Sequence, residues 1–288
     1  MRDMQSEAME QEVSFDAGSK RLRGTLFRPA GNPVAAVVLN SATGAPHGYY
    51  RHFARWLVTN RNMACLTYDY SDFGASATQH PRRSDATMAD WALVDQPAAR
   101  VAMRNLLPDV PIWVVGHSLG AMLMPLQDGI EDVQRMIGVA SGLVHHTDHP
   151  WPYQMLARLF WFGHAPVLVW MLGYLPGRAI GFGSDLPAGV YWQWRRWCTT
   201  PDSYLPEMGQ ELPKADWTRS GAPVSLFAFS DDDTIPPKCV ARLQEVYSTA
   251  NTSCMTLKPS DFGLSNVGHL GAFARRSAAL WPRLIPEA

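Results

Sequence analysis

Short apolar runs alternate with longer amphipathic stretches along most of the chain. Runs rich in β-branched and aromatic residues predict buried strands at 34–39, 63–68, 110–115, 136–140 and 222–229. Stretches with helical spacing lie between them, at about 50–60 and 88–106. Strands and helices that alternate in this order predict a parallel sheet with crossover helices on its faces.

The amino-terminal part follows a different pattern, in which polar and apolar residues alternate. Glu12–Phe15 predicts one strand and Leu22–Phe27 a second, with a turn at Asp16–Ser19 between them. This spacing is typical of an antiparallel hairpin.

The segment Gly116-His117-Ser118-Leu119-Gly120 carries the strongest candidate chemistry. It follows the predicted strand 110–115 and precedes the apolar run 121–124, which contains good helix formers. The order strand, G-x-S-x-G, helix predicts a nucleophile elbow, a sharp turn whose strained backbone pushes the serine outward. A Cβ at either glycine would collide with the neighbouring strand or helix. Ser118 is therefore the candidate nucleophile.

A serine alcohol needs a base beside it and an orienting group behind that base. The predicted strand 222–229 ends in a loop with three aspartates, Asp231, Asp232 and Asp233, and His269 lies in a Gly-flanked loop before a predicted last helix at 272–280. Either loop alone also fits an ordinary turn or a solvated capping segment. The order serine, acid, histidine, with each residue near a strand end, favours a catalytic triad.

These features resemble the α/β-hydrolase superfamily, and more closely the bacterial sequences described as predicted α/β hydrolases with a serine nucleophile and a cap. The resemblance covers nearly the whole chain. It rests on Ser41-Ala42-Thr43-Gly44, Asp90-Trp91-Ala92, the pentapeptide at 116–120, Gly173-Tyr174-Leu175-Pro176-Gly177, Trp194 to Cys198 and Gly268-His269. It implies a mostly parallel eight-stranded sheet flanked by helices, with an inserted helical cap.

The resemblance also bears on which aspartate is the acid. In similar hydrolases the acid lies four residues before the proline of the following loop, and counting back from Pro236 gives Asp232. Asp231 is the alternative, because a register error of one residue is within the reach of sequence interpretation. Asp233 is expected to cap the helix that starts near Pro237.

An oxyanion hole needs two backbone N–H groups. The residue after the nucleophile, Leu119, is expected to supply one. The second is expected from the loop after strand 34–39, at Ala42 or Thr43. Many relatives have His-Gly in this loop, whereas this chain has Asn40-Ser41-Ala42-Thr43-Gly44, which leaves the second donor open. Asn40 or Thr43 could add a side-chain donor, or Asn40 could simply end its strand.

The composition agrees with a folded chain of low net charge. At 288 residues and 47% apolar content it can bury a large core, and a net charge of −1 gives no electrostatic footprint for nucleic acid or for an anionic membrane. Four scattered cysteines and a polar amino terminus without an apolar segment favour a cytoplasmic location and no signal peptide. Cys65, in an apolar run, is expected to be a buried free thiol.

The domain boundaries are expected at 1–141 and 217–288 for the two parts of a hydrolase core, with an aromatic-rich helical cap at 142–216. That stretch holds six of the eleven tryptophans, a composition that suits a lid with an apolar underside. Met155 to Pro176 is apolar enough to suggest a membrane span, but Arg158, His164 and a proline favour a lid helix pair. Interfacial contact, as in lipases, stays open.

The cluster His145-His146-Thr147-Asp148-His149 resembles a metal-binding segment. Helical or strand spacing brings only about two of these side chains to one ion. We therefore expect no metal there, and a loop at the pocket mouth instead, exposed or in contact with substrate.

The sequence thus predicts a serine hydrolase that acts through an acyl-enzyme, without a cofactor, on a small-molecule carboxylic ester with an apolar moiety. An acyltransferase, thioesterase or cyclase with the same triad is the alternative, because exclusion of water cannot be seen in a sequence. A non-catalytic ligand-binding protein is least favoured. Acyl and alcohol identity and oligomeric state stay open.

Overall fold

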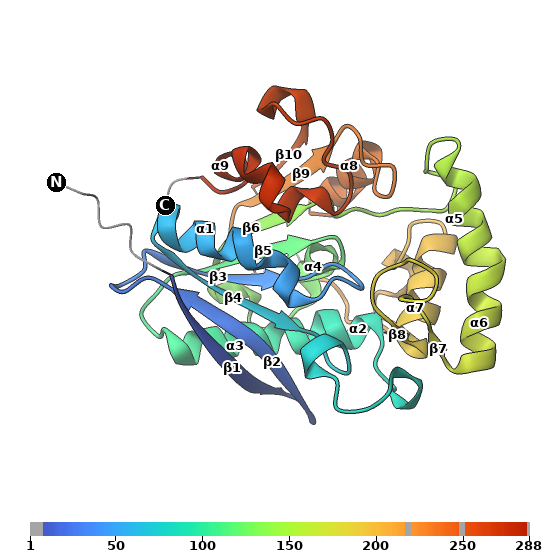
Figure 1. Ribbon diagram of the computed structural model, residues 1–288, viewed down its shortest axis with the longest axis horizontal. Coiled ribbons are helices and arrows are strands. Elements are labelled where there is room, and N and C mark those ends of the chain that lie inside the picture. The colour runs from blue at the N-terminus through green and yellow to red at the C-terminus, as the bar shows by residue number, and fades with distance from the viewer. Residues whose placement is uncertain (1–7, 217–219, 248–250, 287–288) are drawn as a thin grey trace.

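One sheet of eight strands forms the centre of the molecule, in the order β1-β2-β4-β3-β5-β6-β9-β10 (Figure 1). The computed structural model describes residues 8–216, 220–247 and 251–286. The strands are β1 (Met9–Ala17), β2 (Lys20–Arg28), β3 (Ala35–Asn40), β4 (Met63–Asp69), β5 (Ile112–His117), β6 (Val133–Val139), β9 (Val224–Phe229) and β10 (Thr252–Leu257).

The direction of the strands follows the two sequence patterns. β2 is antiparallel to both of its neighbours, β1 and β4, whereas β4, β3, β5, β6, β9 and β10 run parallel to one another. The amino-terminal hairpin and the mostly parallel eight-stranded sheet are thereby confirmed.

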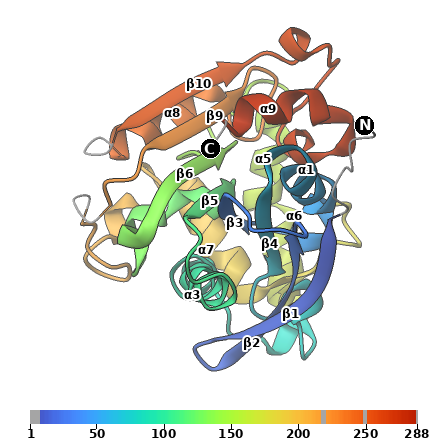
Figure 2. The same ribbon diagram turned by 90° about the vertical axis from the view of Figure 1, so that its left-hand side faces the viewer.

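Helices cover both faces because the parallel strands are apolar on both sides. In β3, Val37 and Leu39 face the cluster that contains α1 (Arg51–Arg61) and the carboxyl-terminal segment, and Ala36 and Val38 face the opposite cluster. Figure 2 shows α1 and α3 on opposite sides of the sheet. The opposite cluster includes residues of α2 (Met88–Asp90), α3 (Gln96–Leu106), α4 (Leu119–Met122) and α8 (Pro237–Val246).

The helix predicted at 88–106 contains a wider π-helical turn at Trp91–Asp95, between α2 and α3. Trp91 Nε1 donates to the Ser71 carbonyl at 3.0 Å, and Asp95 accepts from the Ser71 N–H at 2.7 Å. Two side chains of one turn thus bind the backbone of the same residue. Such turns are uncommon and have no sequence signature of their own.

The prediction of one continuous helix at 272–280 is wrong. The structure has 3₁₀ turns at Gly271–Phe273 and Arg275–Leu280, and a short α9 at Trp281–Leu284. Ala274, between the two turns, is extended, so no single helix can form. Phe273, Leu280 and Trp281 still reach the same buried cluster as α1.

The chain between β6 and β9 forms a lobe at one end of the sheet, which we call the α5–α7 lobe (residues 142–216). It contains α5 (Tyr153–Phe162), α6 (His164–Leu172), the strand pair β7 (Tyr174–Leu175) and β8 (Leu186–Pro187), and α7 (Ala188–Thr199). α5 and α6 follow one another along the right-hand edge of Figure 1. The lobe joins the core partly through the Ala89 N–H, which donates to the Gln193 side chain at 2.8 Å.

Candidate active site

Ser118 lies at the sharp turn between β5 and α4. Its φ is +54° and its ψ −118°, a combination that L-residues rarely adopt, and its N–H donates to the Val139 carbonyl at 3.0 Å. An added Cβ on Gly116 would lie 2.3 Å from the Gly120 carbonyl, and one on Gly120 would lie 2.2 Å from the Asn40 carbonyl. Both glycines are therefore required by close backbone approach, and the strained elbow exposes the serine.

His269 connects Ser118 to a buried carboxylate. Its Nε2 lies 3.1 Å from Ser118 Oγ, and its Nδ1 lies 3.0 Å from Asp232 Oδ2. Because a carboxylate can only accept, Nδ1 carries the proton and Nε2 is left as the acceptor for the Ser118 hydroxyl. Asp232 is 2% exposed, and its Oδ1 accepts from the Thr234 and Ile235 N–H groups, each at 2.9 Å. These bonds fix the carboxylate behind the imidazole.

Asp231, the alternative acid, points to a different partner. Its Oδ2 accepts from the Val267 N–H at 2.7 Å and the Gly268 N–H at 3.1 Å. Gly268 has a φ of +58°, which favours glycine in the turn before His269. The two neighbouring aspartates thus have separate contacts, one with the imidazole and one with the backbone that leads to it.

Asp233 does not cap α8, contrary to the sequence prediction. The N-cap position is Pro236, which has no side-chain cap bond. The Asp233 carbonyl instead accepts from His149 Nδ1 at 3.0 Å. The acid loop is therefore held by the α5–α7 lobe rather than by a helix cap.

The expected oxyanion donors differ in availability. Leu119 is the first residue of α4, so no carbonyl within the helix can accept its N–H. The Ala42 N–H donates to the Tyr50 hydroxyl at 2.9 Å and is thereby occupied. Among the described residues, none accepts a hydrogen bond from the Thr43 N–H. Thr43 therefore remains the available second donor of the two that the sequence suggested.

Asn40 ends its strand and supplies no free donor. Its side-chain amide donates to Gln96 at 3.1 Å and to the Gly120 carbonyl at 3.2 Å, and its oxygen accepts from the Tyr68 hydroxyl at 2.7 Å. These contacts tie the end of β3 to the elbow. The Thr43 hydroxyl faces Met88 Sδ at 3.9 Å, a weak contact.

A hydrogen-bonded chain links the Ala42 loop to the His269 loop. His117 is fully buried, with Nδ1 2.9 Å from the Tyr50 hydroxyl and Nε2 2.9 Å from the His269 carbonyl. Burial, and secondarily His269, lower the pKa of His117 to about 3, so its ring is neutral at ordinary pH.

Because the His117 ring is neutral, the donor and the acceptor of each hydrogen bond between the two loops are fixed. The His269 carbonyl can only accept, so His117 Nε2 carries the single proton and Nδ1 accepts from the Tyr50 hydroxyl. The oxygen of Tyr50 is then available to accept the Ala42 N–H. Burial raises the pKa of Tyr50 well above its usual range, which keeps the phenol protonated for this bond.

Sequence interpretation missed both His117 and Tyr50 as members of this hydrogen-bonded network. The sequence analysis gives His117 no role, although a polar ring at the end of β5, after five buried residues, is a signal in itself. Tyr50 offers no such signal, because it was placed only at the start of the helix at 50–60. Its role depends on a contact with a residue 67 positions away.

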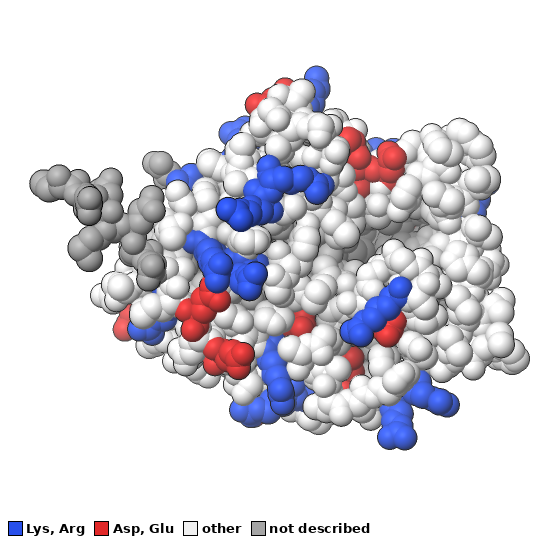
Figure 3. Space-filling model, viewed as in Figure 1, with Lys and Arg blue, Asp and Glu red and all other residues white. Residues whose placement is uncertain are grey.

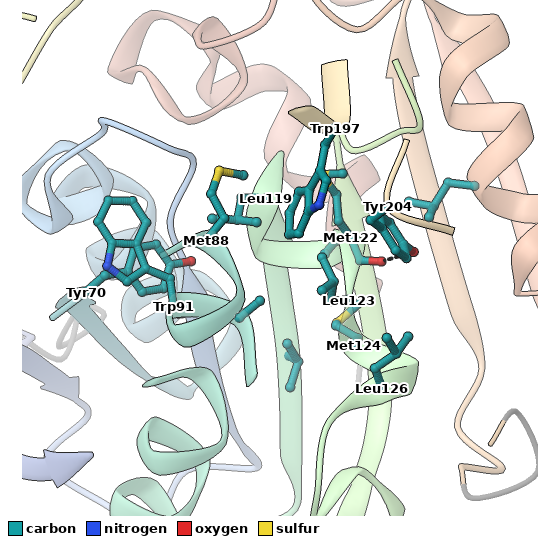
Figure 4. Close-up of a cluster of buried hydrophobic side chains, with 14 of the residues drawn as sticks. Tyr70, Met88, Trp91, Leu119, Met122, Leu123, Met124, Leu126, Trp197 and Tyr204 are labelled. Atoms are coloured by element: carbon teal, nitrogen blue, oxygen red, sulfur yellow. Dashed lines mark hydrogen bonds between the residues drawn. The ribbon is translucent and has the colours of Figure 1, made fainter. Parts of the chain in front are cut away.

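The α5–α7 lobe contacts the loops on both sides of Ser118. The Tyr153 hydroxyl lies 3.0 Å from Thr234 Oγ1 in the loop after β9, and Phe182 and Leu186 lie beside Gly44 in the loop after β3. Over the elbow helix, Trp197 and Tyr204 lie next to Leu119 and Met122 (Figure 4). The Tyr204 hydroxyl donates to the Met122 carbonyl at 2.6 Å. The surroundings of the elbow are thus largely apolar and aromatic.

Side chains of the histidine cluster at 145–149 form hydrogen bonds and ion pairs with other residues of the protein. Asp148 binds Arg242 at 2.9 Å and Lys238 at 3.3 Å, and Arg242 holds the pKa of Asp148 well below its usual range although burial opposes this shift. His145 Nδ1 contacts the Thr147 hydroxyl at 2.8 Å. This loop joins the lobe to α8.

The sheet order, the strand–serine–helix elbow and the late acid and histidine define the α/β-hydrolase class of fold. The chain belongs to the Alpha/beta hydrolase family, whose sequence profile matches residues 36–280. None of the curated proteins matches the chain in sequence.

Solved structures share the fold at low sequence identity. A hypothetical protein from Pseudomonas aeruginosa has a TM-score of 0.60 at 16% identity, with 97% of this chain and 94% of that chain covered. A soluble variant of monoglyceride lipase from Saccharomyces cerevisiae, in complex with a substrate analogue, has a TM-score of 0.62 at 15% identity, with 90% and 88% covered. An esterase from Pyrococcus furiosus has a TM-score of 0.56 at 12% identity, with 95% and 92% covered.

Proposed function

We propose that the protein is a serine hydrolase of carboxylic esters with an apolar moiety, and that Ser118, His269 and Asp232 are its catalytic residues. The observation that carries the proposal is the continuous contact from Ser118 Oγ through the His269 ring to Asp232. The similarity to an esterase and a monoglyceride lipase supports an ester as the substrate class.

In this mechanism His269 Nε2 takes the Ser118 proton as Oγ attacks the ester carbonyl carbon. Asp232 stabilises the imidazolium that forms, and the N–H groups of Leu119 and Thr43 stabilise the oxyanion. His269 then protonates the departing alcohol, which leaves an acyl-enzyme. Water that gives its proton to His269 attacks this acyl group and releases the acid and Ser118. Every proton transferred in these steps passes through His269: from Ser118 to the alcohol in the first step, and from water to Ser118 in the second.

We further propose that residues 142–216 are the cap domain over this site, between core parts 1–141 and 217–288. Two contacts support this: Tyr153 contacts Thr234 in the loop after β9, and Phe182 lies beside Gly44 in the loop after β3. Phe182, which is partly exposed and packs against Phe160 and Trp194, suits contact with an apolar acyl group.

We also propose a cytoplasmic location. Cys65, Cys198, Cys239 and Cys254 are all free thiols, and Cys65 is buried as the sequence predicts. Free cysteines suit a reducing compartment.

The test is the turnover of p-nitrophenyl esters of increasing acyl length, with wild type beside Ser118→Ala. We expect wild type to release p-nitrophenol and the variant to release none above background. An added alcohol separates hydrolysis from acyl transfer: a new ester as the main product would favour the acyltransferase alternative. Absence of turnover and of labelling of Ser118 by a fluorophosphonate would contradict the proposal and favour a binding protein.

A further inference from the structure

The α5–α7 lobe exposes an unusual amount of large apolar surface. On α5 and α6 the side chains of Leu156, Leu159, Phe162 and Val167 are each more than half exposed, and Trp170 is 81% exposed. Together with Trp151, Met155, Met171 and Leu172, these residues form what we call the α5–α6 face. Large apolar patches on a monomer mark sites of interaction.

The side chains of α5 and α6 form one buried row and one exposed row along the two helices. The buried residues are Ala157, Trp161, Ala165 and Val169, one every four positions. Such a row lies on one side of a helix, so the exposed residues lie on the other. Residues 153–172 include an 18-residue window apolar enough to cross a membrane, with a mean hydropathy of 1.4, and 22% of that window is buried. The buried row and the break at Gly163 place the helices along the protein surface.

The charged residues in the segment that carries this face are all positive. Residues 149–184 contain no Asp or Glu, and their only Lys or Arg residues are Arg158 and Arg178. Arg195, from α7, lies 5.3 Å from the centre of the Phe162 ring. Among the described residues neither Arg158 nor Arg195 is in an ion pair with a carboxylate. In Figure 3 the right-hand edge, where α5 and α6 lie, is white apart from a small blue area.

We propose that the α5–α6 face docks on the surface of a phospholipid bilayer that contains anionic lipids. Its apolar side chains would enter the acyl boundary, and its tryptophans suit the interfacial layer. Arg158 and Arg195 would lie beside the phosphates. A symmetric contact with a second copy fits less well, because it would bring the same arginines together with no carboxylate to pair with them.

The docked helices adjoin the candidate active site. α5 begins at Tyr153, which contacts Thr234, and His149 contacts the Asp233 carbonyl. The acid loop is therefore fastened to the segment that we place on the bilayer. This part of the inference rests on the proposed function, and it points to esters of membrane lipids as the substrate class. Docking itself is measured by binding to vesicles, which does not depend on ester turnover.

The experiment is sedimentation of the full chain with vesicles of phosphatidylcholine, with and without phosphatidylglycerol. We expect wild type to bind, more tightly with phosphatidylglycerol and more weakly at high salt. The double variant Leu156→Glu/Trp170→Glu removes exposed apolar side chains without touching the buried row, and we expect it to bind at least about tenfold more weakly. Arg158→Glu is expected to lose the preference for phosphatidylglycerol.

The matched control is Val101→Glu, which changes an apolar side chain of α3 that is 61% exposed and leaves the lobe intact. It is expected to bind vesicles like wild type. Turnover of a dissolved short-chain ester is expected to be equal in all four proteins, so loss of docking is distinguished from loss of the catalytic residues.

Four results would overturn the docking proposal. The first is no binding of wild type to either vesicle, and the second is equal binding of the double variant. The third is a wild-type dimer, seen by light scattering and lost in the double variant, without vesicle binding. Binding that resists extraction by alkaline carbonate would indicate a spanning helix and would contradict surface docking.

Discussion

The neighbouring residues Asp231 and Asp232 show that a shift of one position along the chain changes which groups a carboxylate contacts. Both are aspartates in the same loop, yet Asp232 contacts the His269 ring and Asp231 contacts the Val267 and Gly268 N–H groups. A side chain that faces a ring nitrogen can stabilise a developing imidazolium, whereas one that binds backbone amides positions the loop.

We therefore predict different losses for the two asparagine variants. Asp232→Asn removes the charge behind His269 and is expected to lower kcat by about 10⁴-fold with little change of KM. Asp231→Asn retains an oxygen acceptor for the loop and is expected to lower kcat by less than about tenfold. Steady-state kinetics on one ester checks both. Equal losses, or a larger loss for Asp231→Asn, would reverse the assignment of the acid.

Tyr50 and His117 extend the candidate site beyond the triad. Tyr50→Phe leaves the Ala42 N–H and His117 Nδ1 without their partner, and both are buried. We expect the free energy of unfolding to fall by about 1–3 kcal/mol. We also expect kcat to fall by roughly 10- to 100-fold, because the loop that holds Thr43 loses its anchor, with KM nearly unchanged.

The specific readout for Tyr50 is the affinity for a transition-state analogue, such as a trifluoromethyl ketone. It is expected to weaken in parallel with kcat/KM, which a purely structural role would not cause. The control is Tyr204→Phe, which also removes a buried hydroxyl that donates to a carbonyl. If both variants lose the same analogue affinity, Tyr50 has no particular role in positioning the oxyanion loop.

At the scale of elements, the sharp turn at Ser118 requires glycine at 116 and 120 because backbone atoms lie too close for a Cβ at either position. A Cβ on Gly120 would lie 2.2 Å from the Asn40 carbonyl, so β3 and α4 would have to move apart. We predict that Gly120→Ala lowers the free energy of unfolding by at least about 1 kcal/mol, as measured by urea denaturation. Gly31→Ala, where nothing lies within 4 Å of the added Cβ, is the control and is expected to be near wild type. A stable Gly120→Ala protein with full turnover would contradict the elbow geometry.

Elements with a strong pattern were predictable, and those set by contacts were not. The strand from Met63 and the helix ending near Arg61 follow from apolar periodicity, and each boundary lies within about two residues of the structure. The π-helical turn at Trp91–Asp95 depends on the Ser71 backbone, and the extended Ala274 depends on the packing of Phe273. Periodicity carries no information on either.

The candidate site divides in the same way. Ser118, Asp232 and His269 were predictable because motif, chain order and loop spacing all constrain them. Ala42 and Thr43 could not be told apart, because the difference is whether Tyr50 accepts the N–H. The exposed α5–α6 face was predictable as an apolar segment, whereas which rows of it are buried depends on how the lobe packs.

At the scale of the whole molecule, a buried carboxyl couples stability to pH. Burial raises the pKa of Asp95 to about 7, although a bond from the Ser71 N–H opposes the shift. The folded chain therefore keeps a proton that the unfolded chain loses, and this residue makes stability fall as pH rises from about 4 to about 7.

The variant Asp95→Asn cannot ionise and retains an oxygen for the Ser71 N–H. We predict that its Tm declines less than that of wild type across this pH range, whereas above about pH 7 the two profiles run parallel. Thermal unfolding at a series of pH values checks this. A variant whose profile stays parallel to wild type from about pH 4 upward would show that Asp95 ionises normally.

The central claim is that Ser118 is a nucleophile activated by His269 and Asp232. The most direct measurement is peptide mapping by mass spectrometry after reaction with a fluorophosphonate, with labelling rates compared in wild type, Asp232→Asn and His269→Ala. The account predicts a single adduct on Ser118, formed quickly in wild type and far more slowly in both variants. An adduct on another residue, or equal labelling rates in all three proteins, would contradict it.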